Sequence, residues 1–215
     1  MSALLAWVAV AGALLAPARP SDQLAPLSLA IATRAEAEPP LFKGDVDRHR
    51  TSALLVAIAF RESSLRPDAV GDHVAGKPTS FCAFQLHLPW GATTAEGWTG
   101  AEVAEDPEKC VTAAMRLIRE SMRVCPTAPL AWYAAGPSGC ESVRAQRISR
   151  DRLSLAQRLV RDVKMPSADP STAAFVPGDW PSSGMPLPDL APVIPLLGPL
   201  PLRAHARPRL FCGGA

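Results

Sequence analysis

A glutamate follows a long apolar run, in a setting that can change the chemistry of a carboxyl group. Residues 53–60 are wholly apolar, and Glu62 comes two positions later. A carboxyl group at the rim of a buried helix end loses part of its hydration, which disfavours the charged form and raises its pKa. A general acid that works at neutral pH needs such a raised pKa, so Glu62 is the candidate acid of this chain.

Three short motifs occur around and beyond Glu62 in a fixed order. They are AFRESSLRPDA (59–69), AFQL (83–86) and LAWYAAGP (130–137). Each is weak alone, but the ordered set resembles the motifs of the soluble lytic transglycosylase, or goose-type-lysozyme-like, domain. In that family a helix ends in Glu-Ser, and Gly-Leu-Met-Gln and Ala-Tyr-Asn-Ala-Gly-Pro motifs follow. The resemblance covers about residues 44–163.

The resemblance implies roles for four residues. Glu62 matches the single catalytic acid, and Gln85 matches the glutamine that lines the saccharide groove. Tyr133 matches the tyrosine whose hydroxyl group is held near the acid. Ser63, the serine of the Glu-Ser pair, is a further candidate for substrate binding. The family cleaves the β-1,4 bond between N-acetylmuramic acid and N-acetylglucosamine, so the implied partner is the peptidoglycan glycan strand, and no cofactor is implied.

The chain also departs from the family pattern. Cys82 stands where the glycine of the glutamine motif is expected, and Ala134 replaces the usual asparagine after the tyrosine. The serine often found after the first motif falls on Gly71, and the stretch between Glu62 and Gln85 is a few residues longer than usual. These departures leave the candidate acid in place and concern the contacts to a substrate.

The reaction outcome depends on whether a second carboxylate takes part. Most glycoside hydrolases use two carboxylates. The resemblance instead implies a lytic transglycosylase, in which one glutamate acts as acid and then as base and the product is a 1,6-anhydromuramic sugar. Asp72 is the candidate second carboxylate, although its interpretation as a turn residue after Gly71 is the favoured one. We therefore expect the intramolecular reaction, with lysozyme-type hydrolysis and a non-catalytic cell-wall-binding module as alternatives.

Helices must position these side chains. The polar start and alanine-rich continuation of residues 45–60 predict a helix that ends before Arg66-Pro67. Asp106 followed by Pro107 predicts a second helix start. A shorter helix is expected over 127–135 and a last one from about Ser149. The apolar stripes of the second and last helices are Val111, Met115, Ile118 and Met122, and Leu153, Ala156, Val160 and Val163.

Between the first two helices the pattern is less regular. Residues 70–77 contain two glycines and a histidine, and 81–88 could form a short strand or hairpin. The fold class expected is mostly α: a single lysozyme-like domain with a small irregular or β-hairpin insertion, flanked by a signal-like leader and a Pro-rich tail.

The two ends of the chain differ in composition from its middle. Residues 1–16 are almost wholly apolar and too short for the roughly 20-residue helix that crosses a bilayer. They predict a signal peptide over 1–18, with Ala16-Pro17-Ala18 as cleavage candidate, and hence export to the periplasm or cell envelope. A linker is expected over 19–42 and the domain over 43–165. Eleven of the 23 prolines fall in 166–215, which predicts an extended or disordered tail.

The cysteines support the same compartment. None of the five forms a C-x-x-C pair, which argues against a structural zinc site. Four lie inside the expected domain, and with a signal-like leader two disulfides are the natural interpretation. Three pairings connect four cysteines; we favour Cys82 with Cys110 and Cys125 with Cys140, and Cys212 lies in the tail.

The remaining features argue against a nucleic-acid binder and a metal site, and they leave the other roles open. A formal net charge of +2 argues against a dedicated nucleic-acid binder. No third ligand of suitable spacing accompanies His73 and His87, so no metal site is predicted. Trp90 and Trp98 could stack on sugar rings or pack in the core. The tail could contact secretion, conjugation or cell-envelope machinery. A basic cluster that could hold anionic cell-wall polymers or form a solvated helix face comprises Arg144, Arg147, Arg150 and Arg152.

Overall fold

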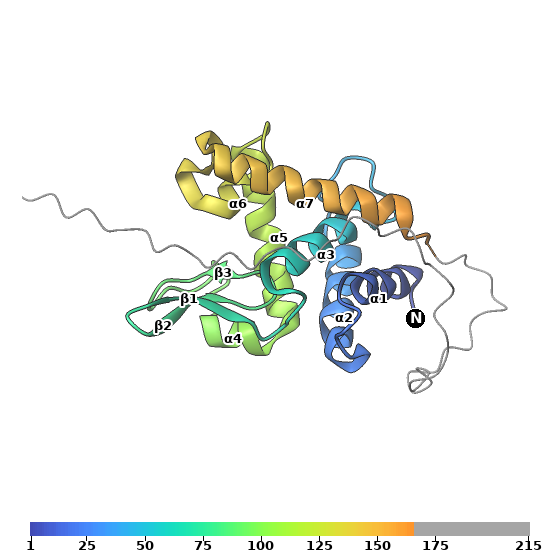
Figure 1. Ribbon diagram of the computed structural model, residues 1–215, viewed down its shortest axis with the longest axis horizontal. Coiled ribbons are helices and arrows are strands. Elements are labelled where there is room, and N and C mark those ends of the chain that lie inside the picture. The colour runs from blue at the N-terminus through green and yellow to red at the C-terminus, as the bar shows by residue number, and fades with distance from the viewer. Residues whose placement is uncertain (166–215) are drawn as a thin grey trace, which may run out of the picture. The chain divides into compact units, whose positions relative to one another are not determined.

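The computed structural model describes residues 1–165, which form one mostly helical unit with a small sheet, as expected. Residues 166–215, with the expected Pro-rich tail and Cys212, lie outside the described part. The elements in chain order (Figure 1) are α1 (Ala3–Leu15), α2 (Ser21–Ala37), α3 (His49–Ser63), β1 (Val70–Val74), β2 (Lys77–Phe81), β3 (Leu86–His87), α4 (Gly100–Glu105), α5 (Pro107–Val124), α6 (Ala131–Ala135), the 3-10 helix η1 (Gly136–Glu141) and α7 (Val143–Asp162).

The central element is α3, the helix expected from the apolar run. Every residue from Thr51 to Ala59 is buried, and α7, α1 and α2 all pack against it. Asp45 caps its start: Oδ1 accepts from the Arg50 amide at 2.9 Å and Oδ2 from the Thr51 amide at 2.7 Å. At its other end Ser64 and Leu65 adopt left-handed conformations and return hydrogen bonds to Phe60 and Ala59. This termination fixes Glu62 in the last turn.

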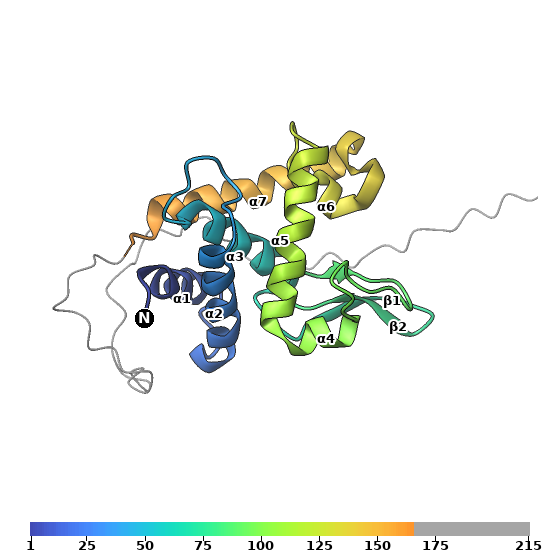
Figure 2. The ribbon, with the colours of Figure 1, turned by 180° about the vertical axis from the view of Figure 1, so that it is seen from behind.

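The second expected helix, α5, begins as predicted. Asp106 accepts hydrogen bonds from the amides of Glu108 (2.9 Å) and Lys109 (3.2 Å), and Pro107 occupies the first turn. Its expected apolar face is inside the domain: Val111, Met115 and Ile118 are buried and Met122 is partly buried. Figure 2 shows α5 from behind, with α4 at its lower end and α6 near its upper end.

The last helix, α7, is longer than expected and is rotated relative to the expected stripe. It starts at Val143, where the Ser142 hydroxyl caps the Ala145 amide at 3.3 Å. Leu153 and Val160, expected inside, are only partly buried. The stripe that packs inward includes polar members, because it faces α6 and a cavity as well as α3: Ala145, Ser149, Arg152, Leu155, Ala156, Leu159 and Val163. The expected helix over 127–135 covers only Ala131–Ala135 and continues as η1.

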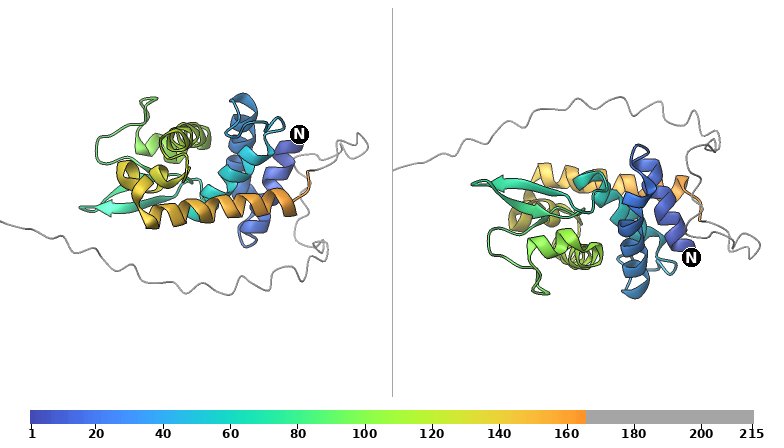
Figure 3. Two further views of the ribbon diagram at one scale, coloured as in Figure 1. Left: turned by 90° about the horizontal axis from the view of Figure 1, so that it is seen from above. Right: turned by 90° about the horizontal axis from the view of Figure 1, so that it is seen from below.

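The insertion is a three-stranded antiparallel sheet in the order β1-β2-β3. Gly71 pairs with Ser80 across the first hairpin, and Phe81 pairs with Leu86 across the second. The stretch 70–77, expected to be irregular, is therefore half of a β-hairpin. The sheet lies at the same end of the domain as α6, with α1 and α2 at the other end (Figures 1 and 3).

The segment expected as a leader forms α1, which packs on α2 and α3. Trp7, Val8 and Ala11 are buried. The Trp7 indole N–H donates to the Val163 carbonyl at 2.8 Å, and its ring meets His49 edge-on with centroids 4.5 Å apart. In the described part of the chain no helix combines the length and apolar character needed to span a membrane.

The segment expected as a linker, 19–42, differs from that expectation because it contains α2. Leu24, Leu27 and Ile31 recur at helical spacing and are buried, and the helix packs on α5 as well as α1. The same segment carries Arg34, which reaches Glu108 of α5 at 2.9 Å.

Replacing Trp7 by alanine tests whether α1 belongs to the folded domain. The loss of its buried ring and indole hydrogen bond should lower the free energy of unfolding by about 3–5 kcal/mol, measured by denaturant titration of the chain that retains residues 1–16. Val10→Ala is the matched control on the exposed side of α1 and should change stability by less than about 0.5 kcal/mol. Equal stability of the two variants would show that α1 does not dock in solution.

Candidate active site

A cavity of about 460 Å³ lies between the sheet and α6. The sheet and its connecting turn supply one wall, α6 the other, and the end of α3 and the middle of α7 lie between them. Its lining residues come from seven separate segments of the chain: Glu62, Asp72, Ser80, Gln85, Leu86, His87, Leu117, Trp132, Tyr133, Ala134, Ala135, Gly136 and Arg152. Glu62, Gln85, Tyr133 and Asp72, four of the residues singled out in the sequence, thus reach one cavity.

Glu62 is held in a mostly buried position at the end of α3, with a side chain 18% exposed. Burial raises the pKa of its carboxyl group above the ordinary value; Arg152 opposes this shift, and the negative charge of Asp72 adds to it. The Arg152 guanidinium forms an ion pair with Glu62 Oε1. The carboxyl group therefore faces the cavity under opposing influences of burial and one cation.

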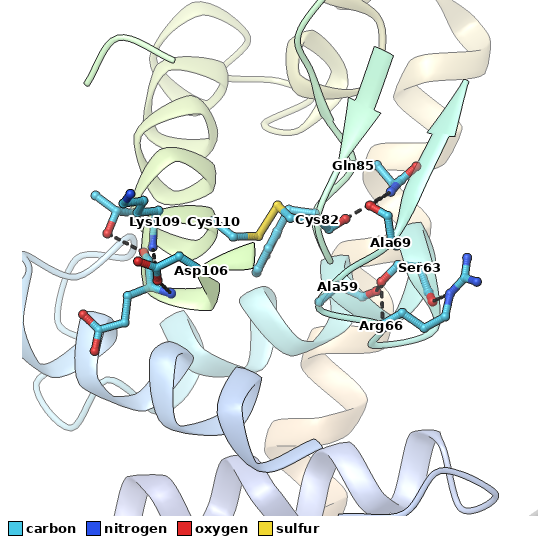
Figure 4. The surroundings of a disulfide bond; sticks show 12 residues. Ala59, Ser63, Arg66, Ala69, Cys82, Gln85, Asp106, Lys109 and Cys110 are labelled. Carbon is cyan, nitrogen blue, oxygen red and sulfur yellow. Dashed lines mark hydrogen bonds between the residues drawn. A yellow bond between two sulfur atoms is a disulfide. The ribbon is translucent and has the colours of Figure 1, made fainter. Parts of the chain in front are cut away.

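Gln85 lies on a turn whose backbone is unusual. Cys82 and Gln85 both have positive φ, 61° and 48°. Cys82 is the residue that stands in place of the expected glycine, and glycine is the residue that adopts such a conformation most readily. Here a cysteine takes it, and the buried Cys82–Cys110 disulfide ties the turn to α5 (Figure 4).

The Gln85 side chain is oriented by the backbone around it. Nε2 donates to the carbonyls of Cys82 (3.0 Å) and Ala69 (3.3 Å), as Figure 4 shows. A Cβ atom at position 71 would lie 2.4 Å from Gln85 Oε1, so Gly71 leaves room for this amide. With Nε2 engaged, Oε1 has no donor among the described residues and is the free polar atom of the side chain.

Tyr133 anchors the other side of the same turn. Its hydroxyl group donates to the carbonyl of Phe84, and its backbone amide donates to Ser121 Oγ at 2.9 Å. Burial, reinforced by the negative charge of Glu62, raises the Tyr133 pKa well above its ordinary value, so the hydroxyl stays protonated. Tyr133 therefore lies in the cavity wall, but its hydroxyl bonds to Phe84 rather than to Glu62.

The remaining site candidates separate into two groups. Asp72 lines the cavity, where its Oδ2 accepts from Ser80 Oγ at 2.8 Å. Ser63 does not line it: its hydroxyl donates to the Ala59 carbonyl at 3.0 Å and accepts from the Arg66 amide at 3.1 Å. The side chain of Ser63 is thus used to terminate α3 and is not available for a substrate.

Of the two histidines and two tryptophans considered in the sequence, only one lines the cavity. His87 lines it, whereas His73 is exposed on β1. Trp90 is 83% exposed with Lys77 Nζ 3.7 Å from its ring centroid, and Trp98 packs against the core. Neither Trp90 nor Trp98 lines the cavity. Within residues 1–165 no group of three or more metal-binding side chains comes together.

Arg152 is the cavity residue that the sequence did not single out by itself. It was grouped with exposed arginines of α7, but its side chain is only 8% exposed. Position 152 falls three after Ser149 and four before Ala156 on the stripe that is buried in the structure, whereas the stripe expected from the sequence began at Leu153. An arginine on a buried stripe requires a partner. No sequence pattern indicated a place in the cavity for Ser80, Leu117 or Trp132.

Comparisons with known proteins do not assign this site. No family, curated protein or solved structure matches the chain. The geometry by itself supplies a mostly buried carboxyl group with a raised pKa, an oriented amide oxygen and an open cavity. That combination suits proton donation to a bound neutral molecule with several polar groups.

The disulfide beside Gln85 should contribute strongly to stability. Chain-entropy arguments for a loop of 28 residues give about 3–4 kcal/mol. We expect the double variant Cys82→Ala/Cys110→Ala to lose roughly that amount of unfolding free energy in a denaturant titration. The Cys125→Ala/Cys140→Ala pair is the control for loss of a disulfide outside the cavity. In heteronuclear NMR spectra, loss of the Cys82–Cys110 disulfide should shift the Gln85 side-chain amide signals, and loss of the Cys125–Cys140 disulfide should not. Unchanged signals in the first variant would contradict the role of the Cys82–Cys110 disulfide in holding this turn.

Proposed function

We propose that this chain is a peptidoglycan lytic transglycosylase with a lysozyme-like domain. The observation that carries the proposal is the meeting of three motif residues, Glu62, Gln85 and Tyr133, on one cavity although they are far apart in the sequence. The motifs resemble one family and occur in its order. The mostly buried setting of Glu62 supports the role of acid, because burial raises the pKa of its carboxyl group.

The proposed reaction uses Glu62 twice. Protonated Glu62 donates its proton to the glycosidic oxygen as the bond to C1 of N-acetylmuramic acid breaks, and the acetamido group of that sugar stabilises the oxocarbenium-like carbon. The Glu62 carboxylate then takes the proton of the C6 hydroxyl group while O6 bonds to C1. The products are the released N-acetylglucosamine end and a 1,6-anhydromuramic end, with no water consumed.

Two surrounding groups support binding of a glycan. Gln85 Oε1 is free to accept a hydrogen bond from a sugar hydroxyl or amide, because Nε2 is engaged by the backbone. Tyr133 and Trp132 present aromatic surface in the opposite wall, which suits the apolar face of a sugar ring. We propose the glycan strand of peptidoglycan as the partner.

Export to the periplasm or cell envelope belongs to the same proposal. Peptidoglycan lies outside the cytoplasm, and disulfides such as the two seen here persist in oxidising compartments. The leader and the Pro-rich segment keep their predicted roles in export and in contacts with envelope machinery.

Removal of the acid tests the function most directly. Glu62→Gln keeps the side-chain volume but cannot donate a proton in this way, so release of muropeptides from purified sacculi should fall by about 10²- to 10⁴-fold. The matched control is Glu105→Gln, an exposed glutamate at the end of α4, which should retain wild-type activity. Full activity of Glu62→Gln would remove the proposed acid, and retention on sacculi without any release by the wild type would favour a binding module.

Hydrolysis is the second candidate, because Asp72 is held by Ser80 in the same cavity. Mass spectrometry of the released sugar ends separates the two reactions. For a transglycosylase, wild type and Asp72→Asn should both give anhydromuramic ends at rates within about tenfold of each other. Reducing ends together with a 10²-fold or larger loss in Asp72→Asn would identify Asp72 as a working second carboxylate and the protein as a hydrolase.

A further inference from the structure

Arg152 is buried beside the candidate acid and has one ion-pair partner among residues 1–165. Its side chain is 8% exposed, and Nη2 contacts Glu62 Oε1. Nε and Nη1 are buried and have no hydrogen-bond acceptor within residues 1–165. The face of Tyr133 lies near the guanidinium, with 5.8 Å between Cζ and the ring centroid. Among the described residues, compensation of this buried charge therefore depends on the Glu62 carboxylate.

The other charged groups near Glu62 do not replace Arg152. Asp72 of β1 is negative, Tyr133 of α6 is a neutral phenol, and His87 of β3 lines the cavity but forms no ion pair with Glu62. Arg61, next to Glu62 on α3, is turned outward to Asp151 at 2.9 Å. Within the described residues Arg152 is thus the one cation in contact with Glu62.

This contact conflicts with the acid role on which the inference rests. An ion pair favours the carboxylate, whereas the proposed first step needs the carboxylic acid. Protonation of Glu62 in the empty cavity would leave a buried guanidinium without an anion, which is costly. The conflict disappears if the pair opens when a glycan enters, because sugar hydroxyl, acetamido and lactyl oxygens can accept from the guanidinium in place of the carboxylate.

We propose that Arg152 is a positioning residue that holds Glu62 as a carboxylate in the empty groove and releases it when a saccharide oxygen takes its place. Glu62 then takes a proton from solvent and becomes the acid of the reaction. Arg152 in this way couples occupation of the groove to the protonation of Glu62. Proton donation is restricted to the state in which a glycan is bound.

The pH dependence of two kinetic constants tests this coupling. The constant kcat/KM reports the free enzyme and kcat reports the bound complex. On soluble glycan strands, the wild type should lose kcat/KM with rising pH at a lower midpoint than kcat. Arg152→Met removes the charge and keeps the length, so its kcat/KM midpoint should rise by about 1–3 pH units and coincide with that of kcat.

Two further variants serve as controls. Arg152→Lys keeps the charge and should keep the separation between the two midpoints. Arg158→Met removes a charge from the exposed side of the same helix and should leave both profiles unchanged. Equal midpoints for kcat and kcat/KM in the wild type would overturn the proposal, and this comparison needs no variant if Arg152→Met fails to fold.

A direct titration separates this inference from the proposed function. In protein labelled with ¹³C at glutamate carboxyl groups, the Glu62 signal is identified by its absence in Glu62→Gln. Its titration midpoint in the free protein should be higher in Arg152→Met than in the wild type and the Arg158→Met control. An unchanged midpoint would overturn the role of Arg152 even in an active enzyme. A shifted midpoint in a chain that cleaves no glycan would retain the charge control and overturn the proposed function.

Discussion

The site depends on a balance between burial of the Glu62 carboxyl group and its attraction to Arg152. Helix α3 is buried along most of its length, so its last turn carries Glu62 into an environment poor in water. Burial favours the acid form and the guanidinium favours the carboxylate, and the two effects have comparable size at buried ion pairs. Breaking such a pair by deletion of one partner commonly costs about 3–5 kcal/mol. The protonation of Glu62 is therefore sensitive to whatever enters the cavity.

A second constraint acts on the turn that carries Gln85. Positive φ at Cys82 and at Gln85 is unfavourable for side-chain-bearing residues. The turn is held from two sides, by the disulfide to α5 and by the hydrogen bond from Tyr133 to the carbonyl of Phe84. Tyr133 thus contributes to the site by fixing the backbone next to Gln85. The glycine expected at position 82 would supply the conformation without strain, and here the covalent bond compensates for its absence.

The sequence could predict those features whose causes are local. The cap formed by Asp106, the start of α5 at Pro107 and the all-round apolar α3 follow from nearest neighbours along the chain and were confirmed. The pairing of cysteines also agrees with the one favoured. Arg152 could not be assigned from such rules, because an arginine is normally an exposed residue of an amphipathic helix. Its burial depends on Glu62, 90 residues earlier.

The predicted elements that differ from the structure also depend on contacts between segments that are distant in the sequence. Residues 70–77 have little strand propensity, with glycine and charged residues among them, and form a hairpin because β2 can pair on both sides. The inward stripe of α7 differs from the expected one because the first half of α7 faces α6 and the cavity, where a serine is hydrogen-bonded and an arginine forms an ion pair. Ser149 Oγ, for example, accepts from the Leu130 amide at 3.0 Å. Local hydrophobicity carries no information on such polar contacts between distant segments.

The packing of α1 bears on the proposed export of the protein. Helix α1 packs chiefly on α2 and α3, and Trp7 bonds to Val163 at the end of α7. The cavity is lined from the last turn of α3, the sheet, α5, α6 and the middle of α7, none of which includes the residues that Trp7 contacts. Both disulfides also lie among these later elements. Removal of a leader helix would therefore expose the faces of α2 and α3 at the opposite end of the domain, while the covalent restraints on the walls of the cavity remain.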